Sequence, residues 1–61
     1  MNQYLANSVL VGFTIRTESG FETVIATDHN EGSTTLWTSD KYEHVTETLY
    51  ASHKIVLVAA V

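Results

Sequence analysis

The chain contains no cysteine and no proline, and its 61 residues include only three lysine or arginine residues. Without cysteine there can be no disulfide framework and no thiolate metal site, which are common ways of stabilising very small domains. The absence of proline fits a chain without a rigid linker. We therefore expect a single small domain over residues 1–61, stabilised by packing or by oligomerisation.

Positive charge is scarce and scattered. The chain has seven acidic residues and only three basic ones, Arg16, Lys41 and Lys54, so the formal net charge is −4. Binding to a phosphate backbone requires clustered cations. We therefore expect no direct contact with nucleic acid.

Long hydrophobic runs are also missing. No stretch approaches the roughly 20 apolar residues of a membrane span. The first four residues, Met-Asn-Gln-Tyr, lack the basic region and long apolar region of a signal peptide. The hydrophobic fraction of 44% is ordinary for a folded domain. These features predict a folded protein of the cytoplasm without a membrane partner.

The acidic residues are confined to the middle of the chain. All seven lie between Glu18 and Glu47, whereas both end segments are apolar. This division predicts that the two ends pair to build a core. The acidic middle then stays in water, as the surface most able to meet a charged partner.

Three segments have the character of strands. Over residues 8–17 apolar residues alternate with others, which predicts a strand with one face in the core. Residues 18–20 predict a hairpin turn that leads into a second strand over residues 21–27. Residues 28–32 predict another turn, followed by a third strand of edge character over residues 33–38.

A helix is predicted over residues 41–52. Asp40 and Glu43 have the spacing of a capping box, in which each side chain binds a free backbone N–H group of the first turn. Apolar residues recur on one side at i, i+3 and i+7, namely Tyr42, Val45 and Leu49.

The last segment, residues 55–61, is uncharged and shows no alternation. Such a run is typical of a strand covered on both faces, so we expect it inside the sheet, paired with the first strand or with a second subunit. The predicted order is β-β-β-α-β. This is an α+β fold with a small twisted, mostly antiparallel sheet of three to four strands and one helix packed on one face.

No residue pattern predicts a catalytic, metal or cofactor site. The three histidines, His29, His44 and His53, lack metal-ligand spacing, and the three glycines form no phosphate-binding fingerprint. A domain of this size has little room for a water-excluding pocket. We therefore expect a non-enzymatic protein. A small enzyme would instead require a deep pocket joining His29 or His44 to a carboxylate.

The candidate surface for a protein partner is acidic with nearby aromatic residues. The predicted helix would carry Asp40, Glu43 and Glu47 in one row, joined by Asp28 and Glu31 from the neighbouring loop over residues 28–32. The simpler interpretations are a solvated helix face for the acidic residues and core packing for the aromatic ones. The predicted partner-binding residues are Asp28, Glu31, Trp37, Asp40, Glu43, Glu47 and Tyr50.

With this acidic row and the capping pair Asp40 and Glu43, the chain resembles the small acidic proteins that bacteriophages use to disable host enzymes. The hairpin, helix and closing strand over residues 9–61 are similar to the layout of the small RNA-polymerase inhibitor of T7-like phages. No sequence motif is shared, so no residue role is transferred. The resemblance implies an inhibitor that acts in the host cytoplasm. Its acidic face would mimic nucleic acid and block a basic surface of a host polymerase or nuclease.

A structural or assembly role is the alternative function. Residues 55–61, or the predicted edge strand over residues 33–38, would then pair with their own copy in a symmetric homodimer. Both hypotheses describe a protein without catalysis, and they differ in which surface is covered.

Overall fold

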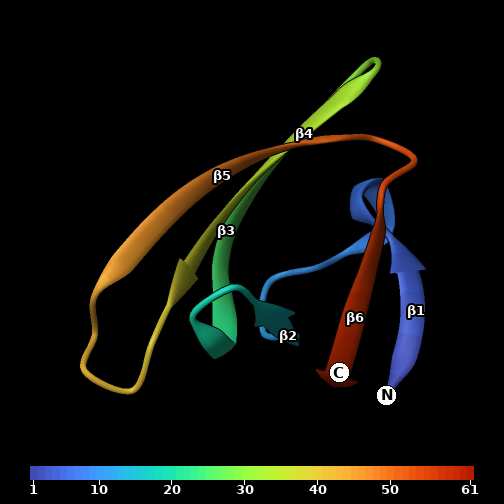
Figure 1. The fold of residues 1–61 in the computed structure, drawn as a ribbon. Helices are drawn as coiled ribbons and strands as arrows, with labels where there is room; N and C mark the ends of the chain where they lie inside the picture. The colour runs from blue at the N-terminus through green and yellow to red at the C-terminus, as the bar shows by residue number, and fades with distance from the viewer.

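All regular structure except one short 3₁₀ helix is β-strand. The computed structural model describes all 61 residues (Figure 1). None of its helical structure has the length and apolarity that crossing a membrane requires. The elements in chain order are β1 (Asn2–Leu5), η1 (Ala6–Ser8), β2 (Thr14–Thr17), β3 (Gly20–Asn30), β4 (Ser33–Ser39), β5 (Val45–Ala51) and β6 (Ile55–Ala60).

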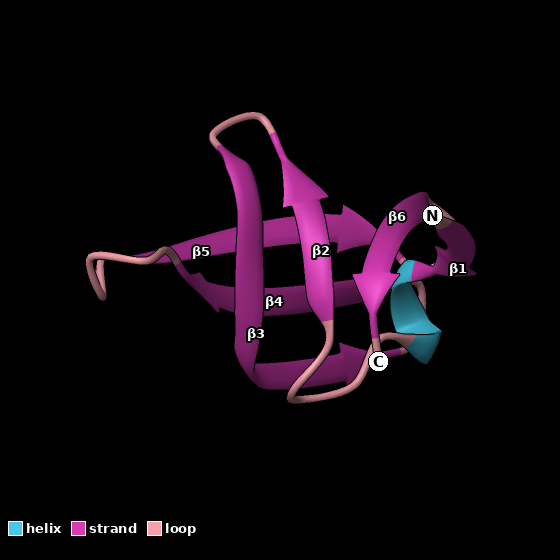
Figure 2. Cartoon of the chain, turned by 90° about the horizontal axis from the view of Figure 1, so that it is seen from below, coloured by secondary structure: helices cyan, strands magenta, loops and turns pink.

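The six strands form one antiparallel sheet that bends back on itself. Their order is β1-β6-β2-β3-β4-β5, so β1 and β5 are the two edges. The start of β3 pairs with β2, and the longer remainder pairs with β4. The register of β3 against β4 shifts between Val24 and Ala26, which leaves Ile25 as the extra residue of a β-bulge. Because a bulge bends its strand, β3 turns a corner, and β2 runs across β4 and β5 (Figure 2).

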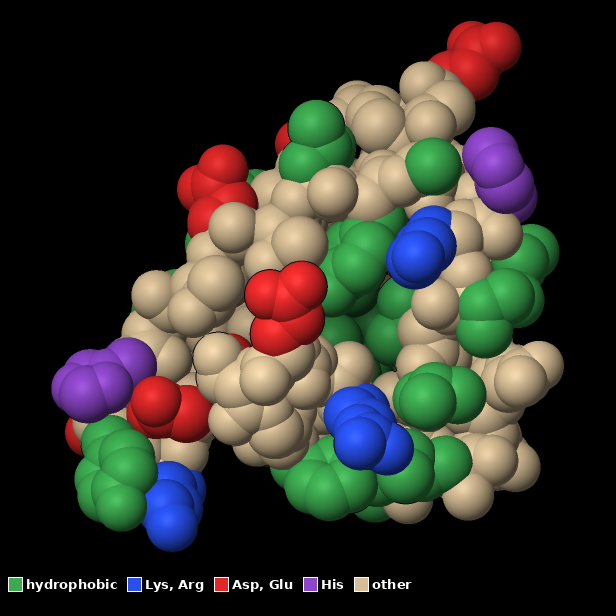
Figure 3. Space-filling view, viewed as in Figure 1, with side chains coloured by type: hydrophobic (Ala, Val, Ile, Leu, Met, Phe, Trp, Pro, Cys, Tyr) green, Lys and Arg blue, Asp and Glu red, His purple; other side chains and the backbone are tan.

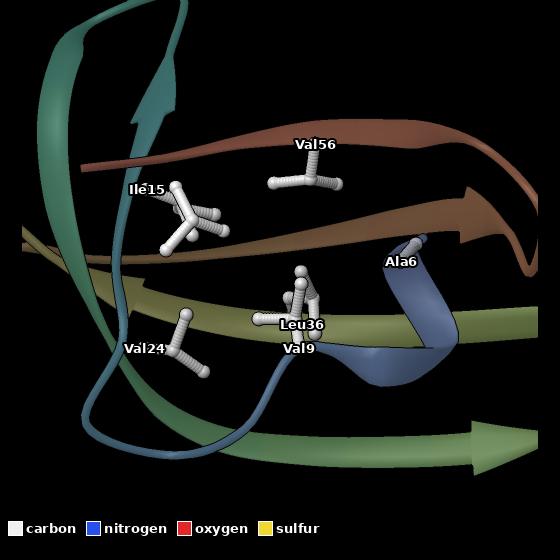
Figure 4. Close-up of a cluster of buried hydrophobic side chains, with 7 residues drawn as sticks. Ala6, Val9, Ile15, Val24, Leu36 and Val56 are labelled. Atoms are coloured by element: carbon white, nitrogen blue, oxygen red, sulfur yellow. The ribbon is translucent and has the colours of Figure 1, made fainter. Parts of the chain in front are cut away.

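The core lies on the inner face of this bent sheet (Figure 4). Small side chains dominate it, with Tyr4, Phe13 and Tyr50 packed around its margin. The rings of Tyr4 and Phe13 meet edge to face with their centroids 5.3 Å apart. The buried hydrophobic residues are Ala6, Val9, Ile15, Val24, Leu36, Val56 and Val58.

The predicted helix over residues 41–52 is wrong, and so is the α+β fold class that depends on it. Residues 45–51 form strand β5, which pairs with β4 along its whole length. Val45, Thr46 and Thr48 are β-branched and Tyr50 is aromatic, and such side chains favour extended backbone. Pairing with β4, whose Leu36 is fully buried, therefore outweighed a helical spacing of three residues.

The capping residues act as predicted only in part, because they close a turn. The Oδ1 atom of Asp40 accepts hydrogen bonds from the backbone N–H groups of Tyr42 and His44, at 2.8 and 2.9 Å. Glu43 has a φ of 64°, in the left-handed region that an α-helix excludes. The N–H of Asp40 donates to the carbonyl of His44 and not to the Glu43 side chain. The capping box is absent, and the chain reverses here into β5.

The other predicted strands were located with mixed success. The hairpin turn near residues 18–20, the strand over 21–27 and the internal position of the last strand are confirmed. The first strand is shorter than predicted, since residues 9–13 form a loop in which Val11 is 60% exposed. The third strand is interior, because β4 lies between β3 and β5. Strand β1 was not predicted, and it pairs with β6.

The conformation of Glu43 leads to a prediction that separates the turn from the helix. Replacing Glu43 by glycine removes the steric cost of the left-handed region, about 1 kcal/mol or more. We expect Glu43→Gly to raise the free energy of unfolding by up to about 1 kcal/mol relative to Glu43→Ala, measured by urea denaturation. In a helix the order would be reversed, because alanine would exceed glycine by about 1 kcal/mol. A more stable alanine variant would therefore contradict the turn.

Candidate functional site

The outer face of strands β3, β4 and β5 gathers three of the seven predicted partner-binding residues. On this face the side chains point away from the core, and two neighbouring cross-strand rows run from β3 to β5. One row consists of Ala26, Trp37 and Glu47, and the next consists of Asp28, Thr35 and Leu49. Asp28, Trp37 and Glu47 therefore lie on one face in neighbouring rows, although the first and the last are 19 positions apart in the sequence.

Trp37 and Glu47 form a polar contact at the centre of this outer face. The indole Nε1–H of Trp37 donates to Oε1 of Glu47 at 3.0 Å. The indole is half-buried and Glu47 is exposed. Since Trp37 uses one carboxylate oxygen, the other oxygen remains available to a donor from a partner.

Around this pair the outer face has exposed apolar side chains and no cation. Val45 and Leu49 of β5 are 57% and 70% exposed. None of the three lysine and arginine residues lies on β3, β4 or β5. The outer face therefore combines exposed apolar side chains with uncompensated carboxylates.

The remaining acidic residues predicted for the partner surface lie at opposite ends of β4. Glu31 is in the turn between β3 and β4, whereas Asp40 and Glu43 are in the loop between β4 and β5. The compact row of Asp40, Glu43 and Glu47 does not exist, because it required the helix. The pKa of Asp40 lies below its ordinary value, mainly because the backbone N–H of His44 donates a hydrogen bond to it. Burial acts in the opposite direction, and the Tyr42 backbone and the His44 side chain lower the pKa further. Asp40 therefore stabilises the turn between β4 and β5.

Tyr50, the seventh predicted residue, lies on the inner face and lines a cleft. The cleft has a volume of about 500 Å³ and separates β5 from the β2–β3 hairpin and β6. Figure 3 looks into this hollow, with apolar side chains inside and acidic and basic side chains around its mouth. The residues at its wall include Arg16, Glu18, Glu22, Thr38, Thr48 and Lys54.

The sequence analysis missed Glu22, which is the buried carboxyl group of this cleft. Only 5% of Glu22 is exposed, and it pairs across strands with the buried Ile15. Its Oε1 accepts from the Thr38 hydroxyl at 2.8 Å, and its Oε2 accepts from the Thr17 hydroxyl at 2.9 Å. The available signal was the period of two along β3, which places Glu22 on the same side as the core residue Val24.

Negative charge in the cleft acts on Tyr50. Burial is the largest cause that raises the pKa of the Tyr50 phenol above 10.0, and the negative charges of Glu22 and Glu18 raise it further. The phenol is therefore a hydroxyl group over the physiological range, and it can donate a hydrogen bond inside the cleft.

The histidines serve separate parts of the structure. His29 lies between Thr34 Oγ1 and the carbonyl of Val9, each 3.1 Å from a ring nitrogen. Because a carbonyl only accepts, Nε2 carries the hydrogen and ties the Val9 loop to β3. His44 Nδ1 is 3.4 Å from Asp40, and His53 is exposed in the turn before β6. No three histidine or acidic side chains are grouped so that they could hold a metal ion.

Comparisons with known proteins do not assign this site. No protein family, no curated protein and no solved structure gives a significant match to the chain. The function therefore has to be inferred from the geometry of the outer face and of the cleft.

The raised pKa of Tyr50 predicts a loss of stability at alkaline pH. Because the folded-state pKa exceeds the unfolded value near 10, this contribution is complete below about pH 10 and is lost as pH rises through the folded-state pKa. Tyr50→Phe should remove that part of the alkaline decline and leave stability at pH 7 within about 1 kcal/mol of the parent. Urea midpoints across the pH range measure the effect.

Tyr42→Phe is the matched control for this experiment, because the Tyr42 side chain is 68% exposed. It should retain the alkaline decline of the parent protein. An unchanged decline in Tyr50→Phe would show that the Tyr50 phenol is not responsible.

Proposed function

We propose that the protein is a non-enzymatic inhibitor that binds a basic surface on a host enzyme which handles nucleic acid. The proposed contact surface is the outer face of β3–β5, with Asp28, Trp37, Glu47 and Leu49 at its centre. The observation that carries the proposal is the Trp37–Glu47 pair on a sheet face without any lysine or arginine.

The chemistry of this face suits a basic protein partner. Aromatic and aliphatic side chains surrounded by polar groups are typical binding anchors, and Trp37 and Leu49 meet that description. Asp28 and Glu47 can pair with lysine or arginine of the partner, while Glu31 and Glu43 extend the negative potential toward both ends of β4. Such a surface competes with the phosphate backbone for the same cations.

A phage origin and the host cytoplasm as its location form part of the same proposal. Acidic composition supports it, through seven acidic against three basic residues. The layout shared with the T7-type polymerase inhibitor no longer supports it, because that likeness required a helix and the segment is strand β5.

Charge reversal on the outer face tests the proposal. The immobilised protein should capture a nucleic-acid-handling enzyme from bacterial lysate at about 50 mM salt and lose it at about 300 mM, because salt screens exposed charges. Double-stranded DNA should displace the captured enzyme, and the soluble protein should inhibit it. Glu47→Lys should weaken binding about tenfold or more, measured by surface plasmon resonance with the captured enzyme.

Glu18→Lys is the matched control, because it changes the charge equally but lies in the β2–β3 turn, away from the outer face. It should bind nearly as well as the parent protein. Equal losses in both variants would indicate a general effect of net charge and count against the outer face. Capture that is insensitive to salt and to DNA would reject nucleic acid mimicry.

Homodimer formation is a second candidate, favoured by the free edge of β5. This edge strand has seven residues and only one charged side chain, Glu47. Long, weakly charged edges are suited to pairing with another strand. The two segments predicted for self-pairing have no free edge, since β4 and β6 are each paired on both sides.

Light scattering of the purified protein distinguishes this candidate. A dimer through β5 should show twice the mass of 6.8 kDa at micromolar concentration. Leu49→Pro should return it to the monomer, because the register leaves the Leu49 N–H on the free edge and proline removes this donor without breaking a hydrogen bond to β4. A parent protein that is monomeric at these concentrations would reject the dimer.

A further inference from the structure

The cleft on the inner face is independent of the outer face and contains a buried acidic group of its own. Its volume of about 500 Å³ is within the usual range of small-molecule sites, roughly 300–1,000 Å³. It exists because β5 ends the sheet and does not pair with β6 (Figure 1). The side chains of Thr46, Thr48 and Tyr50 therefore border an open space.

Glu22 has hydrogen-bonding capacity that the protein does not fill. A carboxylate can accept about four hydrogen bonds, and Glu22 has two hydroxyl donors. The Thr17 hydroxyl is 2.9 Å from both Glu22 Oε2 and the carbonyl of Gly20, and its single hydrogen can serve only one of them at a time. Oε2 is therefore only partly satisfied.

Glu22 also lacks a counter-charge. No lysine or arginine forms an ion pair with it, and the one histidine–carboxylate contact of the molecule, between His44 and Asp40, lies in the loop before β5. A carboxylate that is 95% buried without a cation is costly, and a cation that enters the site removes part of that cost. The ring of Tyr50 beside it offers a further favourable contact, because aromatic faces attract cations.

Two cations stand at the exposed part of the cleft wall. Arg16 and Lys54 are exposed residues that line the cleft, and with Glu18 and Glu22 they bring its formal charge to zero. The exposed residues of the wall, Arg16, Glu18 and Lys54, have a net charge of +1, so a simple cation would gain at Glu22 but not at these residues. A ligand with an inner cation and an outer anion meets complementary charge at both ends.

We propose that this cleft binds a small zwitterion whose ammonium group contacts Glu22 and Tyr50 and whose carboxylate group faces Arg16 and Lys54. The ammonium group supplies a donor to Glu22 Oε2, which otherwise shares the Thr17 hydroxyl with the carbonyl of Gly20. The threonine hydroxyls of the β5 wall accept or donate the remaining hydrogen bonds.

Three probes of similar size test the charge requirement. They are 6-aminohexanoate, which carries both charges, hexylamine, which carries only the cation, and hexanoate, which carries only the anion. Titration of the ¹⁵N-labelled protein, up to about 20 mM probe, should shift backbone resonances of residues that line the cleft. We expect 6-aminohexanoate to bind about tenfold more tightly than either singly charged probe. Absence of any shift, or hexanoate binding as tightly as the zwitterion, would overturn the proposal.

Substitutions test the acidic end and the basic end of the site separately. Glu22→Gln keeps the size of the side chain and an acceptor for Thr38, and it should weaken 6-aminohexanoate about tenfold. Arg16→Gln with Lys54→Gln should reduce 6-aminohexanoate to the affinity of hexylamine and leave hexylamine binding equal or stronger. Lys41→Gln is the matched control, because Lys41 is exposed outside the cleft, and it should bind as the parent does.

If Glu22→Gln fails to fold, the double variant Arg16→Gln with Lys54→Gln still decides the proposal, because both residues are exposed. Unchanged affinity for 6-aminohexanoate in the double variant would overturn it. The result is separate from the proposed inhibition, since Asp28 and Glu47 lie on the outer face and not in the cleft.

Discussion

The bend of β3 at the Ile25 bulge is the constraint on which the rest of the structure depends. A sheet has two faces, and a chain of 61 residues without an α-helix has little else with which to cover one of them. The bulge lets one strand pair with β2 at its start and with β4 afterwards, so the sheet covers its own inner face. The short core side chains, such as Val24, Val56 and Val58, allow the two parts to approach closely.

The same bend produces both candidate surfaces. On the outer side it leaves β3, β4 and β5 as an uncovered face, where cross-strand pairing places Trp37 beside Glu47. On the inner side it stops short of closure, and the space beside β5 becomes the cleft that contains Glu22. Burying Glu22 among threonines costs stability that an aliphatic residue would not. Functional sites are where such costs are usually found.

The hydrogen bonding of Asp40 was predicted correctly, but the secondary structure of the segment that follows it was not. Asp40 does bind free backbone N–H groups, as its side chain and position indicated, but they belong to a turn. The spacing of Tyr42, Val45 and Leu49 matched a helix, and yet the β-branched residues between them matched a strand. The local sequence could not decide between helix and strand, because the deciding contact is the pairing with β4, whose residues are six or more positions away along the chain. The predicted fold class and the predicted acidic row were both wrong for this reason.

The sequence by itself determined the strand character of most of the chain, the β2–β3 hairpin and the internal place of β6, because these depend on side-chain alternation, turn residues and a continuous apolar run. It also determined the acidic composition and the absence of basic clusters. Only the tertiary structure decided that β5 is a strand and an edge, that Asp28, Trp37 and Glu47 share one face, and that Glu22 is buried. Those facts depend on strand order and on register, and a shift of register by one residue exchanges the two faces of a strand.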